Sequence, residues 1–167
     1  TAGATTAVVT PVGTGTTFNV AVSGMTASGT VIANIAASIA TDLAGNDNAA
    51  STSGDNTVIY DITRPTVTVE QAEGQPDPTN LSPIHFTVTF DEPMSGFIAT
   101  DVALSSGTAT LSTSDSIVWD ISVAGMSQGA LSASIPAGRA TDAAGNTNTA
   151  STSADNVVVY DTVVPTV

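Results

Sequence analysis

Apolar and polar residues alternate strictly in several short segments of the chain. The clearest is residues 84–90, in which four large apolar side chains are separated by one His and two Thr. A period of two is typical of a β-strand with one buried face. Because each such segment has one apolar face and one face of Thr, Ser or Asp, antiparallel sheets with a single buried side are predicted. The other predicted strands are residues 66–70, 118–123, 131–135 and 158–160, with weaker ones at 97–104 and 108–112.

The chain contains an internal repeat. Residues 41–67 and 141–167 are identical at 18 of 27 positions with an offset of 100, and residues 18–25 align with residues 119–126 at an offset of 101. A unit of about 100 residues has the size of one β-sandwich domain and is too long for a solenoid repeat. Seven short strands in such a unit predict an all-β fold of tandem immunoglobulin-like β-sandwich repeats.

A recurring Asp-x-x-x-Pro-Thr-Val segment, at residues 61–67 and again at 161–167, marks the boundaries between repeats. Its proline follows a strand-like run and predicts a short, stiff linker. One complete repeat is therefore expected at residues 62–161. Residues 1–61 correspond to the C-terminal half of a preceding repeat, and residues 162–167 to the start of the next repeat or a linker.

The half-repeat carries the same inward-facing pattern as the complete one. Trp119 of the complete repeat aligns with Phe18, which predicts a core position and not a sugar-binding platform. Standing alone, the half-repeat would have unpaired sheet edges and would need strands from a neighbour. The residues expected to face inward there are Phe18, Val20, Val22, Val31, Ala33, Ile35, Val58 and Tyr60.

Composition excludes several classes of function. The chain has no Cys and no Lys, and its two Arg stand against 15 acidic residues, for a net charge of −13. Thiolate metal sites, disulfides and Schiff bases are therefore excluded. No nucleic-acid partner is expected, because phosphate binding needs clustered Lys and Arg. Membrane insertion is not expected either, since no apolar run approaches ~20 residues. An acidic, Cys-free chain with 28 Thr favours an extracellular or cell-surface setting.

One segment matches a catalytic motif without its context. Residues 125–129 fit Gly-x-Ser-x-Gly, the nucleophile elbow of hydrolases. That elbow joins a strand to a helix, whereas this segment lies between two predicted strands. The only histidine, His85, is predicted on an outward strand face. A turn is the better interpretation, so no catalytic residues are predicted and the protein is not expected to be an enzyme.

Two acidic loops precede the last strand of each repeat. Residues 42–46 and 142–146 share the pattern Asp-x-Ala-Gly-Asn. One interpretation is a turn, in which Asp bonds nearby backbone groups and Gly adopts a positive φ. The other is a calcium site, because hard cations bind carboxylate and amide oxygens.

The expected topology brings more carboxylates to the second of these loops. In a seven-stranded sandwich, the loop after the second strand (Asp91, Glu92) lies at the same end as the loop of Asp142 and Asn146, and the chain enters there through Asp61. Carboxylates so close together repel unless a cation lies between them. This predicts a calcium site at the junction. Asp101, in the next loop, is a further candidate ligand. Asp42 and Asn46 are candidates at the preceding junction, and Asp161 is a candidate at the following one.

Three motifs together resemble a known family: Phe-Asp-Glu-Pro-Met-Ser-Gly-Phe, Ala-Thr-Asp-Ala-Ala-Gly-Asn and Val-Tyr-Asp-x-x-x-Pro-Thr-Val, which begin at residues 90, 140 and 159. Their order and spacing resemble the bacterial Ig-like repeats of giant secreted adhesins, including RTX-type and biofilm-associated surface proteins. The resemblance covers essentially the whole chain. It implies tandem sandwiches that form a long stalk, often with calcium at the junctions. The ligands it implies are Asp61, Glu92, Asp142 and Asn146.

One residue departs from the family pattern. Arg64 occupies the position at which the second linker has Val164, so the two linkers need not behave alike.

Two functions from different classes remain. The first is a structural stalk or spacer repeat of an extracellular adhesin or surface fibre, with neighbouring Ig-like repeats as partners and calcium stiffening the junctions. Extracellular modules often bind calcium with dissociation constants of roughly 10⁻⁴–10⁻³ M. The alternative is a subunit of a self-assembling filament or sheath, joined to identical chains by strand addition. A glycan-binding module is disfavoured by the aromatic content of 4%.

Overall fold

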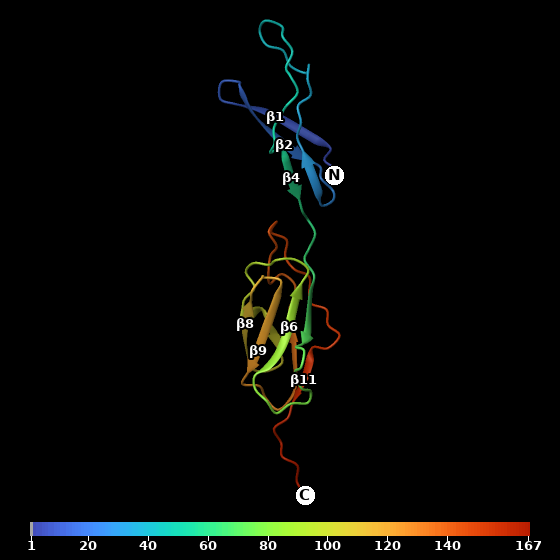
Figure 1. Ribbon diagram of the computed structural model, residues 1–167, viewed down its shortest axis with the longest axis vertical. Coiled ribbons are helices and arrows are strands. Elements are labelled where there is room, and N and C mark those ends of the chain that lie inside the picture. Colours follow the sequence, from blue (N-terminus) through green and yellow to red (C-terminus); the bar gives the residue numbers. More distant parts are fainter. Residues whose placement is uncertain (1) are drawn as a thin grey trace. The chain divides into compact units, whose positions relative to one another are not determined.

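The computed structural model describes residues 2–167, which form strands, turns and one short 3₁₀ helix. Contacts divide the chain into two units, with the division between Thr63 and Arg64. Figure 1 shows the strands of both units. The second unit contains two complete sheets, whereas the first contains two separate strand pairs.

Two antiparallel sheets form the sandwich of the second unit (Figure 1). The all-β sandwich expected from the seven alternating segments is confirmed. The four-stranded sheet has the order β5-β6-β9-β8, with bounds β5 (Val67–Gln71), β6 (Ile84–Phe90), β9 (Val118–Ala124) and β8 (Thr108–Thr113). The three-stranded sheet has the order β11-β10-β7, with bounds β11 (Val157–Tyr160), β10 (Gly129–Ser134) and β7 (Ala103–Leu104).

The apolar face of each strand forms the core between the sheets. In β6 all four apolar side chains are at most 1% exposed, while His85 on the other face remains accessible. Ile121 of the neighbouring strand β9 and Leu131 and Val158 of the facing sheet belong to the same cluster. Burying side chains of this size contributes about 1.5–3 kcal/mol each, so this face is the main source of the sandwich's stability.

Trp119 packs at the rim of this core. Its ring meets Phe97 edge-to-face with centroids 5.2 Å apart, and Phe97 meets Phe90 in the same way at 5.4 Å. Such pairs contribute about 0.5–1.5 kcal/mol beyond the area they bury. The inward position predicted for Trp119 is confirmed, because the side chain packs against the core.

Residues 97–104, expected to form a strand, do so only at their end. Ala99–Asp101 form the 3₁₀ helix η1, and β7 comprises two residues. The Asp101 Oδ2 atom accepts a hydrogen bond from the backbone N–H of Ile98 at 3.0 Å. Local bonds of this kind compete with a strand ladder, so the strand prediction was wrong for most of this segment.

A loop covers the outer edge of β5. The N–H of Val69 donates to the carbonyl of Thr152 at 3.1 Å. The carboxylate of Glu70 holds the same loop by accepting bonds from the N–H groups of Ala154 and Asp155 at 2.9 and 2.7 Å. Because an open strand edge invites association with other chains, this loop protects one side of the sandwich.

The first unit contains four strands in two pairs. One pair joins β1 (Thr6–Val12) to β2 (Thr17–Ser23), and the other joins β3 (Gly29–Ile32) to β4 (Thr57–Tyr60). The repeat offset makes these four strands the counterparts of β8, β9, β10 and β11. Among the residues described in this unit, β5, β6 and β7 have no counterpart.

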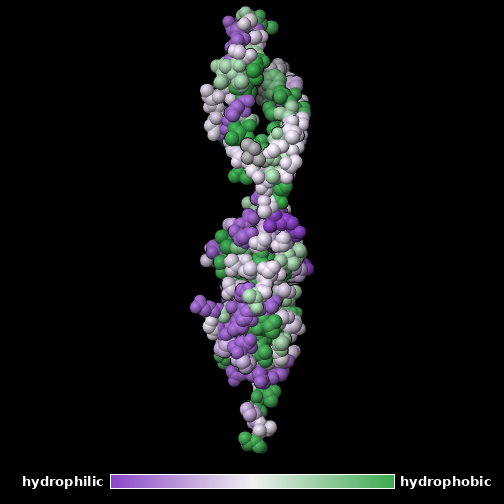
Figure 2. Space-filling model, turned by 90° about the vertical axis from the view of Figure 1, so that its right-hand side faces the viewer, coloured by the Kyte–Doolittle hydropathy of each residue, from purple (hydrophilic) through white to green (hydrophobic). Residues whose placement is uncertain are grey.

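Side chains expected to face inward in the first unit are largely exposed. Phe18 is 52% exposed and Val58 is 66% exposed, whereas Val158, the counterpart of Val58, is fully buried. Figure 2 shows green hydrophobic surface on this unit. The expectation of burial was wrong here, because the strands that cover these positions in the second unit lack counterparts in the described part of the first. The other exposed members of the set are Val20, Ala33 and Ile35.

Candidate metal centre

The loop between β10 and β11 folds around Asp142, which is only 5% exposed. Its Oδ1 atom accepts a bond from the backbone N–H of Asn146 at 2.8 Å, and its Oδ2 atom accepts one from the Asn146 amide at 2.9 Å. Gly145 has φ +92°, a conformation that glycine adopts without strain. The Asp-x-Ala-Gly-Asn pattern thus forms the predicted turn, and the same turn aims a carboxylate into the loop.

Two opposing effects set the protonation of Asp142. Burial raises the pKa of this carboxyl, while the side-chain and backbone hydrogen bonds from Asn146 lower it, and the net pKa lies below the ordinary 3.8. Hydrogen bonds donated to a carboxylate stabilise its charged form. Asp142 is therefore a charged oxygen donor at neutral pH although little of it contacts solvent.

Asn148 holds this loop from the inside. It is fully buried. Its Oδ1 atom accepts bonds from the N–H groups of Arg139 and Ala140 at 2.7 and 2.9 Å, and its Nδ2 atom donates to two backbone carbonyls at 3.0 and 2.6 Å. Asn48 makes the corresponding four bonds in the first unit. Sequence reasoning missed this residue, although the signal was a Gly-Asn-x-Asn pattern present in both repeats.

A backbone bridge joins the loop after β6 to the Asp142 loop. The N–H of Ser95 donates to the carbonyl of Thr141 at 2.8 Å, and the N–H of Thr141 donates back to Ser95 at 3.0 Å. Carboxylate oxygens of Glu92 and Asp142 lie within 4.8 Å of each other. At an effective dielectric constant of about 20, two unit charges at that separation repel by about 3 kcal/mol. The fold thus holds together two acids that a cation would stabilise.

The chain is anchored where it enters the sandwich. Arg64 donates through Nε to the carbonyl of Thr147 at 2.9 Å and through Nη2 to the carbonyl of Asn148 at 2.7 Å. Pro65, the next residue, is buried. Val164 has no side-chain donor, so the second linker cannot form the arginine contacts.

Asp61 lies just before this anchor, in the first unit. Its Oδ1 atom accepts bonds from the Ser28 hydroxyl at 2.8 Å and from the N–H of Thr63 at 2.9 Å. The Thr63 N–H is the largest cause that lowers the pKa of Asp61, followed by the Ser28 hydroxyl. Because Asp61 and Pro65 are four residues apart, the covalent chain keeps their Cα atoms within roughly 14 Å.

Two further candidate ligands take part in local structure. Asp91 accepts bonds from the N–H and the hydroxyl of Thr66 at 2.9 and 2.7 Å. Asp101 bonds the N–H of Ile98, and its Oδ1 atom lies 3.9 Å from Nη1 of Arg139. Both acids thus have protein partners, and their roles as ligands stay predictions.

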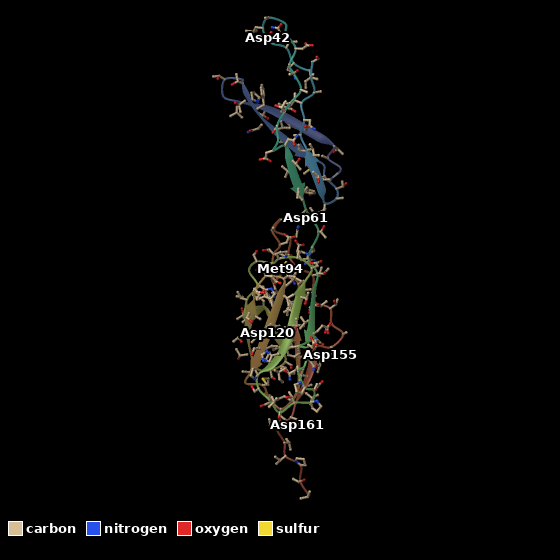
Figure 3. All side chains as sticks on the ribbon, viewed as in Figure 1. Asp42, Asp61, Met94, Asp120, Asp155 and Asp161 are labelled. Carbon is tan, nitrogen blue, oxygen red and sulfur yellow. The ribbon has the colours of Figure 1, made fainter. Side chains whose placement is uncertain are left out.

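Asp42 and Asp161, the candidates of the neighbouring junctions, are labelled in Figure 3 and make local hydrogen bonds of the same kinds. Asp42 accepts bonds from the backbone and side chain of Asn46 at 2.9 and 3.0 Å, and these bonds lower the pKa of Asp42, the side-chain bond most strongly. Asp161 directly follows β11 and accepts a bond from Gln128 at 2.6 Å. The repeated bonds make Asp42 and Asp161 structural equivalents of Asp142 and Asp61.

The residues that meet in this region suit a hard cation. Glu92 and Asp142 carry carboxylate oxygens, and Asn146 carries an amide oxygen. Calcium and magnesium prefer such oxygen donors, whereas softer metals prefer the thiolate and imidazole groups that this region lacks. The chemistry of the donor set therefore fits the calcium ion expected from the sequence.

A family model of the bacterial Ig-like domain matches residues 61–159, more than half of the chain. The chain belongs to this family. The match begins at Asp61 and covers Glu92, Asp142 and Asn146, together with β5 to β10 and most of β11. No curated protein and no solved structure matches the chain.

The remaining motif of this bacterial Ig-like domain is structural. Residues 125–129, which fit Gly-x-Ser-x-Gly, join β9 to β10, so the predicted strand-to-strand turn is confirmed. His85 lies on the outer face of β6, with Nδ1 3.2 Å from Oδ1 of Asp120. In the part of the chain that the structure describes, no helix is long and apolar enough to span a membrane.

Proposed function

We propose that this bacterial Ig-like domain is a non-catalytic spacer repeat in the stalk of an extracellular adhesin or surface fibre, with neighbouring Ig-like repeats as its partners. The observation that carries the proposal is the equivalence of the two exits. In both units a Gly–Tyr pair, Gly29 with Tyr60 and Gly129 with Tyr160, ends the last strand pair, and an Asp follows at once. Chains that leave successive repeats at the same point are what a linear array requires.

The proposed calcium site belongs to the start of each complete repeat. Glu92 and Asp142 supply its core, Asn146 adds an amide oxygen, and Asp61 of the linker is within covalent reach. A calcium ion there would offset the repulsion between the acids and bind a linker residue and a sandwich loop at once. Its chemistry is charge neutralisation, and its mechanical result is a stiffer junction.

Solution scattering tests the stalk directly. A protein of several consecutive repeats is expected to reach a larger maximum dimension in millimolar calcium than in chelator, because each junction loses freedom. The same protein with Glu92→Gln in every repeat is the matched control and should respond much less. Equal maximum dimensions with calcium and with chelator would contradict calcium stiffening of the junctions. A compact particle under both conditions would contradict the stalk itself.

One observation favours the filament as a second candidate. The exposed apolar side chains of the first unit, such as Phe18 and Val58, are a surface to which strands from an identical chain could add. The stalk remains the better proposal, because the matching exits of the two units account for a linear array without any contact between identical chains. Sedimentation of the 167-residue chain over a range of concentrations tests the filament, which requires polymers.

A further inference from the structure

One side chain in each repeat bonds the linker that leaves that repeat. Ser28 donates its hydroxyl to Oδ1 of Asp61 at 2.8 Å and accepts a bond from the N–H of Ile62 at 3.0 Å. In the second unit, Gln128 donates from Nε2 to Oδ1 of Asp161 at 2.6 Å, and its Oε1 accepts from the N–H of Thr162 at 2.9 Å. Each side chain thus holds both the aspartate and the next backbone amide.

The two positions are equivalent although the residue types differ. Ser28 precedes Gly29 as Gln128 precedes Gly129, and both glycines pair with the tyrosine before the linker aspartate. A hydroxyl and a primary amide share the one property that this position uses, which is a donor and an acceptor on one side chain. The same pair of bonds therefore forms twice, in two units with different surroundings.

The aspartate completes the contact through a bond to its own linker. Oδ1 of Asp61 accepts from the N–H of Thr63, and Oδ1 of Asp161 accepts from the N–H of Val163, both at 2.9 Å. Two successive linker amides are thereby satisfied, one by the clamp side chain and one by the aspartate. These bonds restrict the backbone of the linker before any ligand binds, so part of its conformational entropy is already lost.

We propose that Ser28 and Gln128 are positioning residues, here called linker clamps, that fix the orientation of the linker aspartate in the absence of metal. The clamp itself stands on these hydrogen bonds, whereas its effect on calcium affinity rests on the function proposed above. A preorganised carboxylate loses less freedom when a cation binds, so the clamp raises the calcium affinity of the junction. Arg64 also holds the downstream side of the first linker, a contact that Val164 cannot make in the second because it has no side-chain donor.

Nuclear magnetic resonance in chelator tests the clamp without calcium. In the full 167-residue chain, Gln128→Ala is expected to lower the heteronuclear NOE of the Thr162 and Val163 amides to that of a mobile terminus. Gln128→Ser, which introduces the residue type found at the equivalent position Ser28, should keep these amides ordered. Thr162 and Val163 amides that stay equally ordered in Gln128→Ala would overturn the clamp.

Calcium titration then tests the positioning role at Asp61. Ser28→Ala should weaken calcium binding about fivefold, the equivalent of one hydrogen bond, while Ser28→Gln should restore it. Unchanged affinity in Ser28→Ala would overturn the positioning role. A wild-type chain that binds no calcium but whose linker loosens in Gln128→Ala would remove the calcium proposal and support the clamp.

Discussion

Ser95 and Thr141 exchange two backbone hydrogen bonds, 2.8 and 3.0 Å long, although they lie 46 residues apart in the chain. This bridge is the contact that places the loop of Glu92 against the loop of Asp142. Both loops have irregular backbone, so the bridge substitutes for a strand pairing in holding their carboxylates within 4.8 Å. The candidate metal centre therefore depends on a pair of residues that supply no ligand.

Breaking the bridge should impair calcium binding without changing any of the proposed ligands. Ser95→Pro removes the N–H that bonds the Thr141 carbonyl and should cost about 1–3 kcal/mol of stability. It should also abolish the calcium response, measured as the shift in thermal unfolding. Ser95→Ala keeps the backbone bonds and is the control. A calcium shift that survives in Ser95→Pro would show that the bridge is not what assembles the centre.

Asn148 should be among the most sensitive polar positions of the sandwich. Asn148→Ala leaves two N–H groups and two carbonyls of the buried loop without their partner, so the free energy of unfolding should fall by about 3 kcal/mol. Denaturant unfolding followed by Trp119 fluorescence measures this for the second unit. Asn48→Ala, the partly buried counterpart in the first unit, should shift the same transition by less than about 0.5 kcal/mol, because the first unit is a separate set of contacts. Similar shifts for the two variants would contradict the structural role assigned to Asn148.

Phe97 should contribute far more to the stability of the sandwich than the adjacent residue Ile98. Phe97 is 5% exposed between Phe90 and Trp119, whereas the adjacent Ile98 is 58% exposed. Phe97→Ala should destabilise the sandwich by about 3 kcal/mol, and Ile98→Ala by less than about 0.5 kcal/mol. Urea midpoints of the two variants provide the comparison. If Ile98→Ala destabilised the sandwich as much as Phe97→Ala, the assignment of Phe97 to the core and of Ile98 to the surface would be wrong.

Acid should weaken the loop that covers β5. The N–H of Ala154, followed by that of Asp155, holds the pKa of Glu70 below its ordinary value of 4.5. A carboxyl whose pKa is lowered by folding contributes stability that is complete above the ordinary pKa and is lost as the pH falls through the lowered value. Stability measured from neutral pH downwards should thus decline from near 4.5, and less steeply in Glu70→Gln. Identical pH profiles for the two proteins would refute the assignment.

Alternation in the sequence was enough to locate the sandwich, because burial of one strand face leaves a period of two. The strands from β5 to β11 follow that pattern, except at residues 97–104, where the carboxylate of Asp101 bonds the backbone locally and a 3₁₀ helix forms. A polar side chain that caps its own segment leaves no mark on the hydrophobic pattern. The pattern also could not show burial in the first unit, since burial depends on strands that must come from elsewhere.

The acidic candidates were found by residue type, and the residues that organise them were not. Asp142 and Glu92 meet as the topology predicted, but Asn148, Ser95 and Ser28 act through backbone bonds that become visible only in three dimensions. Asn148 was recoverable in principle, because the repeat preserves it. Ser28 was not, since its counterpart is a glutamine and only the shared bonding reveals the equivalence.

Thermal unfolding of the 167-residue chain in calcium, in magnesium and in chelator tests the proposed metal centre most directly. A ligand that binds only the folded state at about 100 times its dissociation constant adds about 2.7 kcal/mol. We expect a calcium-specific rise in the melting temperature of the second unit, and little rise in Glu92→Gln. Unchanged melting in all three conditions would contradict a calcium site at Glu92 and Asp142 and reduce both loops to turns.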